Sequence, residues 1–225
     1  MRRAVLAITV AATTLGTTGV VALLTAAPSA AASCTDNWQG PTTGTTNWNA
    51  SAADWSSGFP VSTSVVCITL PGSYTVDLTS NSNSNINSLQ IGGASSGTQT
   101  LLVDGSSTNL SLSLAVASTV ESGGLLTVEP SASGFALLGG AGGVTVDSGG
   151  TLSTVGAAGS SNAYIRTPVT NLSGGTVTIG APSTNQDSNT LTTNSGSFTV
   201  SAGATLALGG SSSFTSSAGT VTVTG

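Results

Sequence analysis

The sequence contains no histidine and no lysine, and its only cations are three arginines. Without imidazole, the protein can build no catalytic triad or metal site of the kind that depends on histidine. Without a basic face, it cannot displace counterions from a phosphate backbone. Charged residues make up 5% of the chain, against roughly 25% in an average soluble domain. These shortages exclude an electrostatic nucleic-acid binder, and they predict neither a cofactor nor a metal site.

Small hydroxyl residues and glycine dominate what is present. The 225 residues include 37 serines, 37 threonines and 30 glycines. Hydrophobic residues reach 38%, and they occur in short, evenly spaced runs rather than in one long segment. Such runs can form a packed core, so the composition indicates a folded, polar-surfaced protein.

The first 32 residues have the pattern of a signal peptide. A basic start at Arg2 and Arg3 precedes an uncharged, largely apolar stretch, and small residues lead up to Ala32, after which we expect cleavage. Threonine and glycine interrupt the apolar stretch, which argues against a membrane anchor. Removal of residues 1–32 leaves Arg166 against eight carboxylates, a net charge of −7. We therefore expect a secreted, anionic protein with no membrane span after processing.

The two cysteines, Cys34 and Cys67, both follow the predicted leader. In an oxidising compartment, a pair of this kind predicts one disulfide. The alternative is lipid attachment at Cys34. Lipoprotein signals usually place leucine or a similar aliphatic residue three positions before the cysteine, where this chain has Ala31, so the disulfide is favoured.

A turn motif recurs through the second half of the chain. An aliphatic residue precedes Ser-Gly-Gly, and a short strand-like run of alternating aliphatic and hydroxyl residues follows it, as in the stretches 120–128, 146–155 and 172–179. Strands this short are stable only when copies stack on one another. We therefore predict an all-β fold, a right-handed parallel β-helix with repeats over 86–225. A β-sandwich is the alternative, since it also reads as short strands with glycine-rich turns.

All three tryptophans, Trp38, Trp48 and Trp55, fall in the segment 33–85 that precedes the repeats. A solenoid needs an end cap that shields its first coil from water, and a tryptophan cluster pinned by a disulfide would supply one. The alternative is an exposed platform on which the three indoles stack sugar rings.

The stretch from Asn49 to Pro60, followed by Val-Val-Cys-Ile and Tyr-Thr-Val-Asp-Leu, resembles the N-terminal module of exported bacterial surface proteins described as adhesin-like or filamentous-haemagglutinin-like. The leader looks actinobacterial. The resemblance implies a right-handed parallel β-helix with an extracellular structural or adhesive role. It shares only its fold with pectate-lyase-like enzymes.

Residues suited to catalysis are scarce. Glu121 and Asp147 precede successive Ser-Gly-Gly turns, and we expect them to stack one coil apart. No third acid continues that row, and Arg166 is the only cation that remains. We therefore assign no catalytic residue, with a polysaccharide lyase or hydrolase as the minor alternative.

Paired threonines indicate a further possibility. Thr-X-Thr occurs three times at spacings of 14 and 30 residues, at Thr176 and Thr178, Thr190 and Thr192, and Thr220 and Thr222. Flat threonine ladders on a β-solenoid resemble ice-binding faces, although threonine is also a favoured outward strand residue.

The last residues stop within a strand pattern, so we expect the solenoid to continue beyond Gly225 in a longer protein or to self-associate through its last coil. The function expected from the sequence is a secreted, non-catalytic stalk for surface structure or adhesion. The alternative is a module that binds carbohydrate or cell wall. The expected partners are extracellular polysaccharide or a host or surface ligand, and not nucleic acid.

Overall fold

The computed structural model describes residues 33–81, 84–106, 109–188 and 190–224. The predicted signal peptide and its cleavage site after Ala32 lie outside these ranges and stay predictions. Within the described ranges, the chain forms 22 β-strands and one short 3-10 helix, η1 (Ala52–Asp54).

The strands form three parallel sheets, and within each sheet neighbouring strands pair in chain order. Sheet 1 consists of β1 (Asp36–Asn37), β3 (Val65–Ile68), β6 (Ser88–Ile91), β9 (Ser118–Val120), β12 (Val144–Val146), β15 (Val169–Asn171), β18 (Leu191–Asn194) and β21 (Ser213–Ser216). Sheet 2 consists of β2 (Thr43–Asn47), β4 (Ser73–Leu78), β7 (Gln99–Asp104), β10 (Gly124–Glu129), β13 (Thr151–Thr154), β16 (Thr176–Ile179), β19 (Ser197–Val200) and β22 (Thr220–Val223). Sheet 3 consists of β5 (Asn85–Ile86), β8 (Leu110–Leu114), β11 (Ala136–Gly139), β14 (Ala163–Arg166), β17 (Thr184–Gln186) and β20 (Leu206–Leu208).

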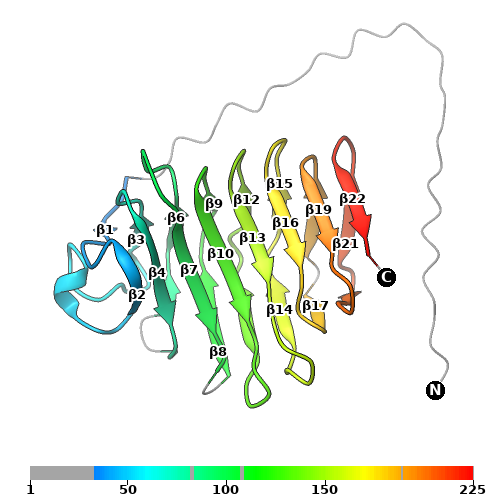
Figure 1. Cartoon of the computed structure of the whole chain (residues 1–225), viewed down its shortest axis with the longest axis horizontal. Coiled ribbons are helices and arrows are strands. Elements are labelled where there is room, and N and C mark those ends of the chain that lie inside the picture. Colours follow the sequence, from blue (N-terminus) through cyan, green and yellow to red (C-terminus); the bar gives the residue numbers. More distant parts are fainter. Residues whose placement is uncertain (1–32, 82–83, 107–108, 189, 225) are drawn as a thin grey trace, which may run out of the picture. The chain divides into compact units, whose positions relative to one another are not determined.

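From β3 to β22, the chain passes repeatedly through sheets 1, 2 and 3 in turn, and each strand pairs in parallel with the strand one coil later (Figure 1). This arrangement is the predicted parallel β-helix. The β-sandwich alternative is wrong, because the named strands pair with the next coil rather than forming two antiparallel sheets packed face to face.

The Ser-Gly-Gly motif forms the corner between sheets 1 and 2, and its two glycines serve different purposes. The first, as in Gly149, adopts a φ of +80°, which L side chains rarely adopt. The second, Gly150, adopts ordinary backbone angles, but a Cβ there would lie 2.2 Å from the carbonyl oxygen of Val120 in the preceding coil. The corner therefore requires glycine for conformation at one position and for space at the next.

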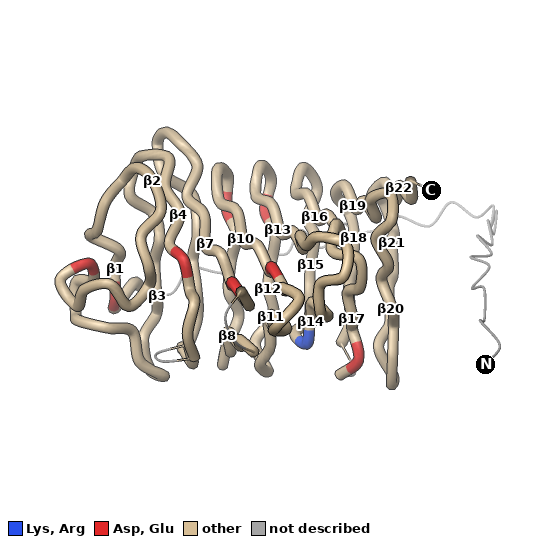
Figure 2. The backbone as a smooth tube through the Cα atoms, turned by 60° about the horizontal axis from the view of Figure 1, so that its bottom comes forward, with Lys and Arg blue, Asp and Glu red and all other residues tan. Residues whose placement is uncertain are grey.

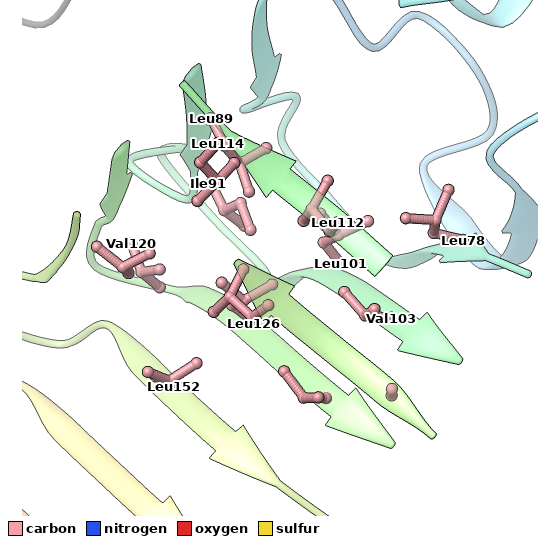
Figure 3. Packing of buried hydrophobic residues seen from close by; sticks show 14 of the residues in the cluster. Leu78, Leu89, Ile91, Leu101, Val103, Leu112, Leu114, Val120, Leu126 and Leu152 are labelled. Carbon is pink, nitrogen blue, oxygen red and sulfur yellow. The ribbon is translucent and has the colours of Figure 1, made fainter. Parts of the chain in front are cut away.

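The core is a set of aliphatic columns that run along the solenoid (Figure 3). In one column, Leu101, Leu126 and Leu152 lie directly opposite one another on successive strands of sheet 2, each with no exposed surface. Burial of a leucine side chain is worth about 1.5–3 kcal/mol. Because strand residues alternate between faces, each column leaves a neighbouring column of outward side chains on the solvent face.

The later coils place polar residues in these inward columns. The column of Val120 and Val146 in sheet 1 continues with Asn171 and Asn194. The Asn171 amide nitrogen donates to the Asn194 side-chain oxygen at 2.7 Å and to the Ser197 carbonyl at 2.9 Å. The amide ladder thus replaces aliphatic packing with hydrogen bonds between coils, as buried polar groups require.

The segment 33–85 contributes β1 to β4 to the same sheets as the later coils. Its distinctive part is the connection 48–64 between β2 and β3, which contains η1. An isolated antiparallel bridge between Trp38 and Trp55 holds this connection against the chain just after β1. The cap is therefore built onto the first coils.

Candidate functional site

The three tryptophans form a buried cluster. Trp38, Trp48 and Trp55 are 1%, 0% and 2% exposed. The Trp55 ring centroid lies 5.0 Å from that of Trp38 and 4.7 Å from that of Trp48, and Trp38 stacks on Tyr74 of β4. Sugar stacking needs an open ring face, and these rings have none. The interpretation of Trp38, Trp48 and Trp55 as a glycan-stacking platform is therefore wrong, and the predicted cap is confirmed.

The predicted disulfide between Cys34 and Cys67 is present, with the two Cα atoms 5.8 Å apart. It joins the residues before β1 to the middle of β3, so it fixes the start of the first coil to the second. With both sulfurs in this bond, the thiol that lipidation of Cys34 requires is not available in this structure.

Glu121 and Asp147 stack at the corner between sheets 1 and 2, as their spacing predicted. The preceding residues, Val120 and Val146, are paired in register, and the Gln90 amide donates to the Glu121 carboxylate at 3.0 Å. Burial, and then the charge of Asp147, raises the pKa of Glu121. Among the described residues, no group of three or more His, Cys, Asp or Glu side chains is placed to hold a metal ion.

A second group of acids lies on the outward side of sheet 2. Asp104 and Glu129 are directly opposite each other on β7 and β10, and Asp77 lies on the neighbouring strand β4. Burial raises the pKa of Asp77 to about 6, and the charges of Asp104 and Glu129 add to this effect. One side-chain oxygen of Asp77 is buried with no hydrogen-bond partner. The group is therefore a site of charge repulsion.

Beyond these acids, the outward face of sheet 2 carries only small hydroxyls on four successive strands, β13, β16, β19 and β22. Register pairing aligns them in two rows of four. We call this set the hydroxyl array, and it consists of Thr151, Thr176, Ser197 and Thr220 in one row and Ser153, Thr178, Thr199 and Thr222 in the other. Adjacent members of a row are separated by one strand spacing, about 4.8 Å. Figure 2 shows the acids of sheet 2 on the earlier strands, away from the array.

The threonine pattern seen in the sequence is only partly the array. Thr176, Thr178, Thr220 and Thr222 belong to it, but Thr190 and Thr192 are buried at 3% and 1% exposure. Thr192 lies on β18 of sheet 1, where its inward side chain accepts a hydrogen bond from Gln186. The expectation that this pair continues the outward row is wrong. Ser197 and Thr199 fill the place, because the coil from Thr176 to its register partner Ser197 takes 21 residues.

A further row of threonines on sheet 1 was missed in the sequence. It occupies the single outward position of five successive strands, β9, β12, β15, β18 and β21, and consists of Thr119, Thr145, Thr170, Thr193 and Thr215. Each is flanked by two inward residues, so the only signal in the sequence is an isolated threonine between buried positions. Coils of unequal length hide its periodicity.

The interior cavity between β13, β14, β16 and β19 offers no room for a substrate. It is lined by Leu152, Phe198 and Gln186 among others, and it has a volume of about 10 Å³. That is about the space of one water molecule. Binding to this part of the solenoid therefore takes place on its outer faces.

Comparison of the chain with protein-family models, with curated proteins and with solved structures finds no match. In the part of the chain that the structure describes, no helix is long and apolar enough to cross a membrane.

Proposed function

We propose that this protein is an exported, non-catalytic structural and adhesive module, which uses the hydroxyl array of sheet 2 to hold a regular, uncharged polymer such as a wall or extracellular polysaccharide. The observation that carries the proposal is the array itself, two straight rows of hydroxyls held in register on four strands. The leader pattern, the disulfide and the resemblance to adhesin-like surface proteins support export.

Rigidity is what makes weak hydroxyl contacts useful. A single hydrogen bond contributes about 0.5–1.5 kcal/mol net, and a flexible surface would lose much of that gain in ordering its side chains. The β-branched threonines of the array have restricted χ1 angles, and their backbone is fixed by hydrogen bonds on both sides. A partner with its own regular spacing can therefore engage many hydroxyls together.

The distribution of charge supports an uncharged partner. The array rows contain no ionisable residue, while Asp77, Asp104 and Glu129 lie on earlier strands of the same sheet. An anionic polymer lying along sheet 2 would meet these carboxylates. The repulsion favours a neutral polysaccharide over an acidic one.

Retention of the protein on insoluble cellulose, chitin and peptidoglycan tests the proposal. The double variant T178K/T199K places long cations at the centre of the array. We expect it to lose about tenfold in retained protein, since it disrupts both the flatness and the hydrogen-bonding pattern. The matched control is T145K/T170K on sheet 1, which adds the same charges to the outward row of another face and leaves retention unchanged.

Two results would contradict the proposal. One is a wild-type protein that none of the three polymers retains. The other is equal retention of the array variant and the control variant, with both shown to be folded by circular dichroism.

Ice is a second candidate partner for the same array. The favouring observation is that all eight positions are serine or threonine, in rows that repeat every strand spacing in one direction. The measurement is thermal hysteresis of the freezing point. The expected result is hysteresis in the wild type and in T145K/T170K, and none in T178K/T199K. Hysteresis that persists in T178K/T199K rules out this face.

A further inference from the structure

The outward face of sheet 3 differs in chemistry from the hydroxyl surfaces of the other two sheets. It contains Tyr164 and Arg166 on β14, with Asp187 directly after β17. Arg166 is the only cation among the described residues, and it lies on the surface beside Asp187 (Figure 2). Tyr164 is one of the few aromatic side chains in the described chain that is neither buried nor directed inward.

The contacts join these residues into one ordered group. The Arg166 guanidinium makes a bidentate pair with Asp187, with Nε donating at 2.6 Å and Nη2 at 3.0 Å. Its Cζ lies 4.3 Å from the centre of the Tyr164 ring, and the Phe135 ring meets Tyr164 edge to face at 5.5 Å. An arginine held by a bidentate pair and an aromatic ring is already ordered before a ligand arrives.

An apolar surface adjoins the ion pair. Leu137 lies opposite Tyr164 on β11, and Gly139 lies opposite Arg166. The Leu137 side chain leans over Gly139, so that a Cβ on Gly139 would lie 2.7 Å from a Leu137 methyl carbon. Leu137, Tyr164 and Phe135 therefore form a partly exposed hydrocarbon surface next to the guanidinium and the carboxylate.

We propose that this group, centred on Tyr164, Arg166 and Asp187, is a binding site for a neutral pyranose unit. Two of the five guanidinium N–H donors are used in the ion pair, which leaves three for a ligand. The Asp187 carboxylate keeps further acceptor capacity. A vicinal diol matches this pair, because one hydroxyl donates to the carboxylate while its neighbour accepts from the guanidinium, and the C–H faces of the sugar lie on the apolar surface.

The charge balance selects a neutral sugar over a uronate or a phosphosugar. Asp187 already neutralises Arg166, and the ion pair is about one-third exposed on both sides. The other seven carboxylates of the chain have no cationic partner among the described residues. An anionic glycan therefore gains no net attraction at this face.

Soluble cellohexaose is the probe, because each of its units presents equatorial vicinal hydroxyls and it requires no solid surface. Titration of the full chain, followed by NMR shifts of backbone amides, is expected to show saturable binding with shifts confined to β11, β14 and β17. Affinity should fall about tenfold in Y164A and in D187N. D187N keeps the side-chain volume, so it serves as the variant least prone to misfolding. The array variant T178K/T199K should bind cellohexaose as the wild type does.

Oligogalacturonate is the matched anionic probe, and it should not bind. Failure of cellohexaose to saturate, shifts on sheet 2 instead of sheet 3, or preferred binding of oligogalacturonate would each overturn the site. The test is separate from that of the proposed function. Loss of polymer retention in T178K/T199K concerns the hydroxyl array, and loss of cellohexaose binding in D187N concerns sheet 3.

Discussion

Replacement of Asp77 by asparagine should stabilise the protein at neutral and alkaline pH and leave it unchanged in acid. Asp77 has one buried side-chain oxygen without a hydrogen-bond partner, and it lies near Asp104 and Glu129. Burial, and then these two charges, raises its pKa from 3.8 to about 6 in the folded protein. The folded state therefore binds this proton more tightly than the unfolded state does.

The sign of the pH dependence follows from that difference. Because the folded pKa is raised, the contribution to stability is fully present below about pH 4 and is lost as the pH rises through about 6. Two pKa units correspond to about 3 kcal/mol. Asp77 is partly exposed, and solvent screening reduces this figure to about 1–2 kcal/mol. D77N removes the charge and keeps the shape, so it should recover that amount at pH 8.

Urea denaturation at pH 4 and pH 8 in low salt measures the effect, since guanidinium chloride would screen the charges. The control is D54N, which removes a carboxylate from η1 and not from the group on sheet 2. The reasoning is refuted if D77N changes the unfolding free energy equally at both pH values, or if it destabilises the protein at pH 8.

Three further predictions concern the solenoid itself. G150A should destabilise by about 2–3 kcal/mol, because the new Cβ meets a backbone oxygen that cannot move without separating two coils; G159A, whose Cβ has open space and only a positive φ, should cost about 1 kcal/mol in the same thermal melts. N171A should cost about 2–3 kcal/mol in urea, because it removes the donor for two buried acceptors; a smaller loss than in N81A, at a more exposed amide, would contradict the role of the ladder. Reduction of the disulfide, which spans 33 residues, should lower stability by about 4 kcal/mol, with tryptophan fluorescence reporting whether the cap opens first; identical melts with and without reductant would disprove it.

Much of the fold could be predicted because its signals are local. The alternation of aliphatic and hydroxyl residues defines strands, and Ser-Gly-Gly defines a corner that only glycine can occupy. Repetition of the two implies stacking, since strands of three to six residues cannot be stable alone. Cys34 and Cys67 were the only available disulfide partners, so their pairing also followed.

The candidate sites could not be predicted in the same way, because they depend on which residues of different coils become neighbours. Thr192 has the same local pattern as Thr178, yet one is buried in sheet 1 and the other faces outward on sheet 2. Unequal coil lengths decide that difference, and they can be measured only once the sheets are assembled. Arg166 and Asp187 are 21 residues apart, with nothing in the sequence that marks them as a pair.

The sequence by itself therefore determined the parallel β-helix, the glycine corners, the cap and the disulfide, since each rests on patterns within one coil or on a unique pairing. It left the exposure of the tryptophans open, because an indole reads the same whether it seals a core or lies on a surface. Only the tertiary structure decided that Trp38, Trp48 and Trp55 are buried. It also decided that hydroxyls form the array on sheet 2 and that Tyr164, Arg166 and Asp187 meet on sheet 3. The physical reason is that lateral register between coils is set by the combined packing of every inward column, and no single coil contains that information.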